Sequence, residues 1–91
     1  MKLIFPNPSR SFDDSAHRVR FWGYDRASEV AFFVESGALR RLRPNLEAAE
    51  AGFLQAFDEA RSRIEEVAEK VYGRGSRGKG GYGYVLTAAD F

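Results

Sequence analysis

Two stretches of alternating residues constrain the fold of this chain most. Apolar or small residues occupy every second position in residues 18–24 and again in residues 29–35. A period of two is that of a β-strand with one buried face. Pairing the two strands about Arg26 and Ala27 sets Phe21 opposite Phe32, whereas a slip of one residue would mix the two faces. The sequence therefore predicts a β-hairpin whose buried face comprises Val19, Phe21, Gly23, Val30, Phe32 and Val34.

The opposite face of this hairpin combines arginine with aromatic side chains. Such a face can neutralise phosphates and stack on bases. Arginine, tryptophan and tyrosine are equally typical of the energetic centres of protein–protein interfaces. The short helix or the N-terminal loop could also cover the face within the monomer. All three interpretations fit the sequence, and the residues concerned are Arg18, Arg20, Trp22, Tyr24 and Phe33.

A long apolar stripe follows the hairpin. In residues 46–71 apolar side chains recur at spacings of three and four, which confines them to about 100° of a helix surface. With Asn45 as N-cap, Gly73 as C-cap residue and no phase shift at Gly52, we predict one helix to about Tyr72. It would be about 42 Å long, against about 30 Å for a compact domain of this size. One end is therefore expected to overhang.

Three shorter elements complete the predicted fold. Residues 2–5 favour a short first strand, residues 36–42 a short helix stopped by Pro44, and residues 82–87 a last strand. We predict a single α+β domain over residues 1–91 in the order β-β-β-α-α-β. Its antiparallel sheet, made of the N-terminal strand, the hairpin and the C-terminal strand, would be covered on one face by one short and one long helix.

Composition excludes several kinds of chemistry. A chain of 91 residues forms one hydrophobic core. It has no cysteine, so disulfides, thiolate metal sites and cysteine nucleophiles are absent. The apolar run after Lys2 is too short for a signal peptide or a membrane span, and we expect a cytoplasmic protein without a membrane partner. The net charge of +1 gives no overall attraction to polyanions.

A glycine-rich loop, residues 73–81, contains GxGxxG and, in residues 73–80, differs by one residue from GxxxxGK[ST]. Phosphate-binding loops of these kinds follow a strand and open a helix. Here the predicted order is reversed, and Gly80 replaces the hydroxyl that would hold magnesium. We predict a flexible basic loop instead, in which Arg74, Arg77 and Lys79 could contact an anion.

His17 is the single histidine and lies near Asp13, Asp14 and Ser15. One imidazole is a small part of a zinc site, and a catalytic triad needs a nucleophile oriented by the fold. We interpret His17 as a solvated loop residue. The sequence indicates no catalytic residue, no metal ligand and no cofactor, so we do not expect an enzyme.

Three stretches together resemble a known family: FPNPSRSF at residues 5–12, VRFWG at residues 19–23 and LTAADF at residues 86–91. The resemblance is to short bacterial proteins known only as a domain of unknown function. It implies a compact bacterial domain with a sheet and helices. It implies no activity and no site residues.

These observations favour a non-catalytic binding or regulatory module that acts through protein–protein contacts. We expect a protein partner or self-association, with a homodimer formed through the overhanging helix end or a sheet edge. The alternative is single-stranded nucleic-acid binding through the arginine and aromatic face and the basic loop. The candidate binding surface comprises Arg18, Arg20, Trp22, Tyr24, Phe33, Arg74, Arg77 and Lys79.

Overall fold

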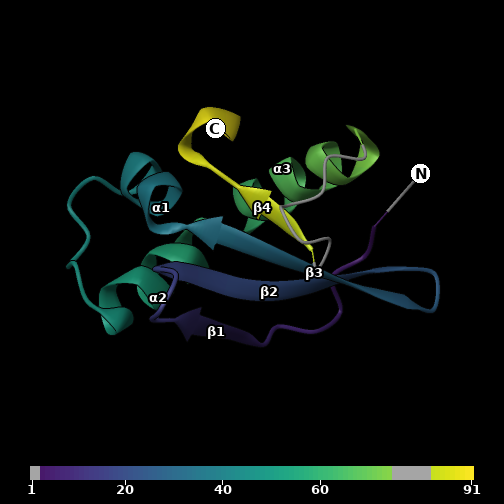
Figure 1. The fold of residues 1–91 in the computed structure, drawn as a ribbon, viewed down its shortest axis with the longest axis horizontal. Coiled ribbons are helices and arrows are strands. Elements are labelled where there is room, and N and C mark those ends of the chain that lie inside the picture. Colours follow the sequence, from purple (N-terminus) through teal and green to yellow (C-terminus); the bar gives the residue numbers. More distant parts are fainter. Residues whose placement is uncertain (1–2, 75–82) are drawn as a thin grey trace.

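The computed structural model describes residues 3–74 and 83–91 and confirms the α+β class. Within these residues, a four-stranded sheet in the order β1-β2-β3-β4 is combined with three α-helices and a final 3-10 helix (Figure 1). The elements in chain order are β1 (Arg10–Asp13), β2 (Arg18–Asp25), β3 (Ser28–Glu35), α1 (Ser36–Leu42), α2 (Glu50–Glu59), α3 (Arg61–Arg74), β4 (Tyr84–Leu86) and η1 (Ala88–Asp90).

The hairpin of β2 and β3 has the predicted register. Phe21 pairs with Phe32 and Val19 with Val34. All four side chains are at most 1% exposed, so the alternating apolar residues do form a buried inner face. The turn lies at Arg26 and Ala27, as predicted. Arg26 has a φ of 58°, in the left-handed region used by tight hairpin turns.

The first strand lies later in the chain than predicted. Ile4 makes only an isolated bridge to Tyr24, with N···O distances of 3.0 and 2.8 Å. In an antiparallel pair the next residue to exchange such bonds is two positions on, and that residue is Pro6, which has no N–H to donate. The ladder stops there, and β1 (Arg10–Asp13) forms after the second proline.

The last strand is parallel to its neighbour, so the sheet is mixed and not wholly antiparallel as predicted. Val34 is aligned with Leu86 in this parallel pair. The chain returns from β3 to β4 through the helices, and a crossover of that kind brings two strands together in the same direction. Tyr84 and Leu86 are buried on the inner face, while Tyr82 lies outside the described residues.

The predicted long helix is two helices. It breaks at Ala60, where φ is −105° and ψ is 14°. The prediction of a single long helix with one overhanging end is therefore wrong. The break lets α2 and α3 both lie against the sheet in a molecule measuring 35 × 26 × 21 Å. The apolar stripe keeps its phase across Ala60, and the sequence has no glycine or proline there, so nothing local indicated the break. Gly73 lies inside α3 rather than after it.

The start of α2 is also later than predicted, with Ala49 and not Asn45 as N-cap. The preceding loop folds back over Gly52. A Cβ on Gly52 would lie only 1.9 Å from the carbonyl oxygen of Glu47. Gly52 therefore serves a close approach of the backbone and not a bend in a helix.

Helices α2 and α3 lie on one side of the sheet, behind it in Figure 1. Phe57 of α2 and Ile64 of α3 are fully buried against the inner face. The N-terminal segment joins the same core, since the Phe5 ring centroid lies 6.2 Å from that of Phe32. None of the described helices is long and apolar enough to cross a membrane.

Candidate interaction face of the sheet

The face of the sheet that points away from α2 and α3 is called the outer face here. Directly paired residues of neighbouring strands project to the same side, so the pairings define its members. All five residues predicted from the hairpin lie on it together. Its members are Ile4, Ser11, Asp13, Arg18, Arg20, Trp22, Tyr24, Glu29, Ala31, Phe33, Glu35 and Val85.

Two arginines stack on aromatic rings of this face. The guanidinium carbon of Arg18 lies 3.8 Å from the ring centroid of Phe33. The guanidinium carbon of Arg20 lies 5.9 Å from the same ring and 5.2 Å from that of Trp22. Phe33 is 9% exposed although no described helix lies on this side. The described residues of the outer face thus pack on one another through cation–π contacts. The N-terminal segment touches one end of the face, where Ile4 pairs with Tyr24 and the Asn7 side chain hydrogen-bonds Tyr24.

The charged groups of the outer face are not all paired. Arg18 lies 3.2 Å from a carboxylate oxygen of Asp13. The Tyr24 hydroxyl donates to Glu29 at 2.9 Å, and this hydrogen bond raises the pKa of Tyr24. Within residues 3–74 and 83–91, neither Arg20 nor Glu35 has an ion-pair partner. One cation and one anion of the outer face therefore have no ion pair among the described residues.

The overall charge of the outer face is not that of a polyanion-binding surface. Its described members include two arginines, Arg18 and Arg20, against three carboxylates, Asp13, Glu29 and Glu35. Phosphate backbones are bound where Lys and Arg outnumber carboxylates. The balance among the described residues thus disfavours the nucleic-acid interpretation of this face.

An exposed apolar residue extends the outer face beyond the hairpin. Ile4 is 53% exposed, and no other large hydrophobic side chain among the described residues is exposed. Its bridge to Tyr24 places it beside the aromatic residues. Sequence reasoning missed Ile4 as a site residue, although Leu3 and Phe5, which point to the core, offered the signal of alternation.

Of the basic-loop candidates, only Arg74 lies within the described residues, and it does not join this face. Arg74 ends α3, on the helical side of the sheet, where its guanidinium lies 3.3 Å from Asp90. Arg77 and Lys79 lie outside the described residues. His17 is exposed in the turn between β1 and β2 with a φ of 51°, and its carbonyl oxygen accepts the Ser36 N–H at 3.0 Å.

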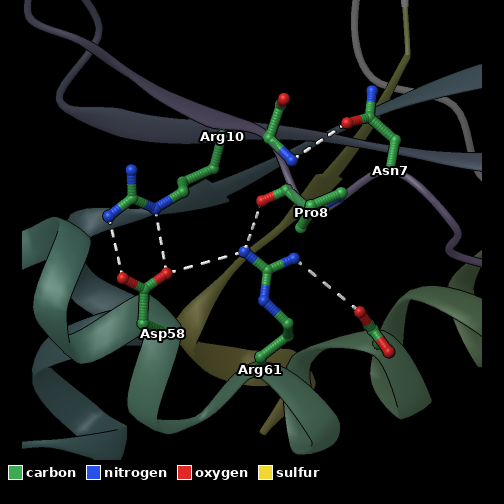
Figure 2. Close-up of polar contacts among 7 residues, drawn as sticks. Asn7, Pro8, Arg10, Asp58 and Arg61 are labelled. Carbon is green, nitrogen blue, oxygen red and sulfur yellow. Dashed lines mark hydrogen bonds and ion pairs between the residues drawn. The ribbon is translucent and has the colours of Figure 1, made fainter.

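A charged cluster that the sequence did not indicate joins β1 to the junction of α2 and α3 (Figure 2). Arg10 donates two hydrogen bonds to Asp58, at 2.9 and 2.8 Å, and these hold the pKa of Asp58 below its usual value. Arg61 donates to the Pro8 carbonyl at 2.8 Å, and its guanidinium carbon lies 4.7 Å from the Phe57 ring centroid. Every group is engaged within the fold, so we interpret the cluster as structural.

A cavity of about 280 Å³ lies between α2 and the loop before it. Its Glu59 carboxylate is already engaged by Arg43 at 3.3 Å and by Gln55 at 3.1 Å. In residues 3–74 and 83–91, no three His, Cys, Asp or Glu side chains are grouped to hold a metal ion.

Comparisons with known proteins agree with this architecture. A family described as "Protein of unknown function (DUF1488)" matches residues 3–83, which confirms the resemblance to a domain of unknown function. A crystal structure of a protein of unknown function from the same family, from Shewanella loihica PV-4, is similar with a TM-score of 0.80. The two sequences are 19% identical, and the match covers 96% of this chain and 93% of that one. At that identity the likeness shows the fold. No match was found among curated proteins.

Proposed function

Since the chain belongs to DUF1488, a family of proteins of unknown function, we propose its role from its surface: it is a non-catalytic module that binds protein through the outer face. The observation that carries this proposal is a patch of half-buried aromatic side chains with the exposed Ile4 beside them, on a sheet face without a described helix over it. Ile4, Tyr24 and Trp22 lie on adjacent positions of that patch. Contiguous apolar surface of this kind is typical of interaction sites.

The chemistry of the patch suits a protein partner. Tryptophan, tyrosine and arginine dominate the binding energy of protein interfaces when water is excluded from them. Arg20 adds a cation that has no counter-ion within the described monomer and is already oriented by Trp22. A partner that covers Trp22 and supplies a carboxylate to Arg20 would bury apolar area and complete an ion pair at once.

The non-catalytic part of the proposal is supported by how the acidic residues are used. Asp58 and Glu59 are both exposed and engaged by arginines. Burial raises the pKa of Glu65, but Arg61 opposes that shift and no second carboxylate faces it among the described contacts. An acid/base pair of carboxylates in a closed cleft would be needed for hydrolytic chemistry.

The test is a binding experiment with matched variants. We compare three tagged proteins: the wild type, Trp22→Ala and Arg63→Ala. Each is used to capture partners from the native host, and the self-association of each is measured directly. Arg63 is the control because it is exposed on α3, paired only with Glu66. The proposal expects binding to be lost in Trp22→Ala and kept in Arg63→Ala. Equal binding by all three proteins would contradict it.

A titration with single-stranded RNA or DNA separates the nucleic-acid alternative. Base stacking would quench the emission of Trp22, the single tryptophan, and the affinity would fall steeply with salt. Our proposal expects unchanged emission. Quenching with a steep salt dependence would replace protein binding by nucleic-acid binding on this face.

A further inference from the structure

We infer that the partner of the outer face is a second copy of this chain, docked face to face about a two-fold axis parallel to β2 and β3 and midway between them. The inference rests on the proposed function and names its partner. Its basis is the pairing of the outer-face residues across the hairpin. The pairs are Arg18 with Glu35, Arg20 with Phe33, Trp22 with Ala31, and Tyr24 with Glu29.

Such an axis exchanges the two strands of the hairpin between copies. Each residue of β2 then lies over the residue of β3 that is its own cross-strand partner, but in the second copy. The pairs within the monomer therefore become the pairs between the two copies, and each occurs twice. Whether this dimer is favourable depends only on whether the members of each pair complement one another.

The charged pairs complement one another. Arg18 would face Glu35 of the second copy, and Glu35 has no ion-pair partner within the described monomer. Tyr24, a hydroxyl donor, would face Glu29, the same carboxylate type that accepts its hydrogen bond in the monomer. Both contacts bring opposite charge or donor and acceptor together.

The remaining pairs differ in what they add. Trp22, the largest side chain of the face, would lie over Ala31, one of the smallest. A large residue that faces a small one allows two sheets to interdigitate. Arg20 would lie next to Phe33 of the second copy, but that ring is 9% exposed and already carries its own Arg18 at 3.8 Å, so this pair adds no further cation–π contact.

The complementarity selects this axis over the other simple one. An axis perpendicular to the strands, between the rows of Phe33 and Ala31, would set Glu29 over Glu35 of the second copy. Two like charges would then face each other twice. The axis parallel to the strands avoids this, and it keeps the strands of both sheets within about 30° of each other, as in aligned sheet packing.

The size of the face predicts a weak dimer. Strands lie about 4.8 Å apart and same-face residues about 6.8 Å apart along a strand, so the twelve positions of the outer face cover roughly 400 Å². A standard stable interface buries about 800 Å² on each partner. We therefore expect dissociation constants of about 1 to 100 µM.

Analytical ultracentrifugation of the full chain tests this with two charge-reversed variants. Arg18→Glu sets two carboxylates face to face in its homodimer, and Glu35→Arg sets two arginines face to face. Each variant alone should associate at least tenfold more weakly than the wild type. In a mixture of the two, every reversed residue meets an opposite charge, so a mixed dimer of about twice 10.2 kDa should form. Glu66→Arg, on the exposed side of α3, is the control that should leave association unchanged.

A measurement on the unaltered protein guards against misfolded variants. On dilution of the wild type from about 500 to about 1 µM, the emission of Trp22 should shift to the red as the dimer dissociates and exposes the indole. A wild type that stays monomeric throughout overturns the inference. The proposed function then still stands if Trp22→Ala loses a different protein partner. A wild-type dimer that neither variant weakens also overturns the inference, because another surface must form it.

Discussion

The ring centroids of Phe21 and Phe57 lie 5.1 Å apart, which joins β2 to α2 across the inner face of the sheet. Both side chains are at most 1% exposed. Phe57 also carries the Arg61 guanidinium on its ring, at 4.7 Å. This contact lies where the hairpin, α2 and the start of α3 meet, so its loss should be felt by the whole core.

Replacement Phe57→Ala should lower the free energy of unfolding by about 3 to 5 kcal/mol, because it leaves a cavity in a close-packed core. That is a large share of what so small a domain has. Denaturant melts measure the change, with Phe57→Leu as a control expected to cost less. A loss below about 1 kcal/mol would show that the packing of α2 on β2 is not as described.

The fold could be read from the sequence where a pattern is local. The alternation around Phe21 and Phe32 specifies both strands and their register, because side chains of a strand alternate with a period of two. The same alternation placed Trp22 on the opposite face. The helical stripe predicted which residues of α2 and α3 are buried, including Phe57 and Ile64.

The features that were missed depend on contacts between distant residues. The break at Ala60 has no glycine or proline to mark it and follows from fitting α2 and α3 onto one sheet. The ion pair of Arg10 and Asp58 joins residues 48 positions apart. Gly52 was predicted to lie within one continuous helix, but its role is to admit the backbone at Glu47, which only the three-dimensional structure shows.

Replacement Gly52→Ala should destabilise the protein by about 2 kcal/mol or more, because its methyl group would require the loop to move. The new Cβ would lie 1.9 Å from the Glu47 carbonyl oxygen, which belongs to the backbone and cannot turn aside. Gly37→Ala in α1 is the matched control, since nothing lies within 4 Å of the added atom. It should be neutral or stabilising by up to about 1 kcal/mol. Thermal melts of equal stability for the two variants would contradict this account of Gly52.

The pair of Arg10 and Asp58 should contribute to stability in a pH-dependent way. The hydrogen bond from Arg10 is the main reason that the pKa of Asp58 lies below its ordinary value of 3.8. A carboxyl whose pKa is lower in the folded state stabilises the fold above its unfolded pKa, and loses that contribution as the pH falls through its folded pKa. The contribution should be complete above about pH 5 and vanish in stronger acid.

Denaturant melts of Asp58→Asn and wild type between about pH 2 and pH 7 measure this contribution. The variant should be less stable near neutrality, by at most about 1 kcal/mol because the pair is partly exposed. The two proteins should converge at the acid end. Glu65, whose pKa is raised by burial, shifts both curves in the opposite sense and cancels in the comparison. A constant difference at every pH would mean that the loss is one of packing and not of charge.

Truncation should lower the free energy of unfolding much more at Phe21 than at its neighbour Trp22, because the two side chains project to opposite faces of β2. Phe21 is 1% exposed in the core, so Phe21→Ala should cost about 3 to 5 kcal/mol. Trp22 lies on the outer face with one side of its indole against Arg20 and no described helix above it. Trp22→Ala should therefore cost less than Phe21→Ala, about 1 to 2 kcal/mol, since the half-buried indole is only partly removed from water in the monomer. Urea melts at low protein concentration, where any dimer has dissociated, compare the two variants directly. The wild type in the same samples should show indole emission that is red-shifted and readily quenched by acrylamide.

The contrary outcome is a loss of about 3 kcal/mol or more in Trp22→Ala, together with wild-type emission that is blue-shifted and protected at every concentration. The indole would then be packed inside the monomer. The outer face would then be part of the core, and neither a protein partner nor a second copy could bind through it.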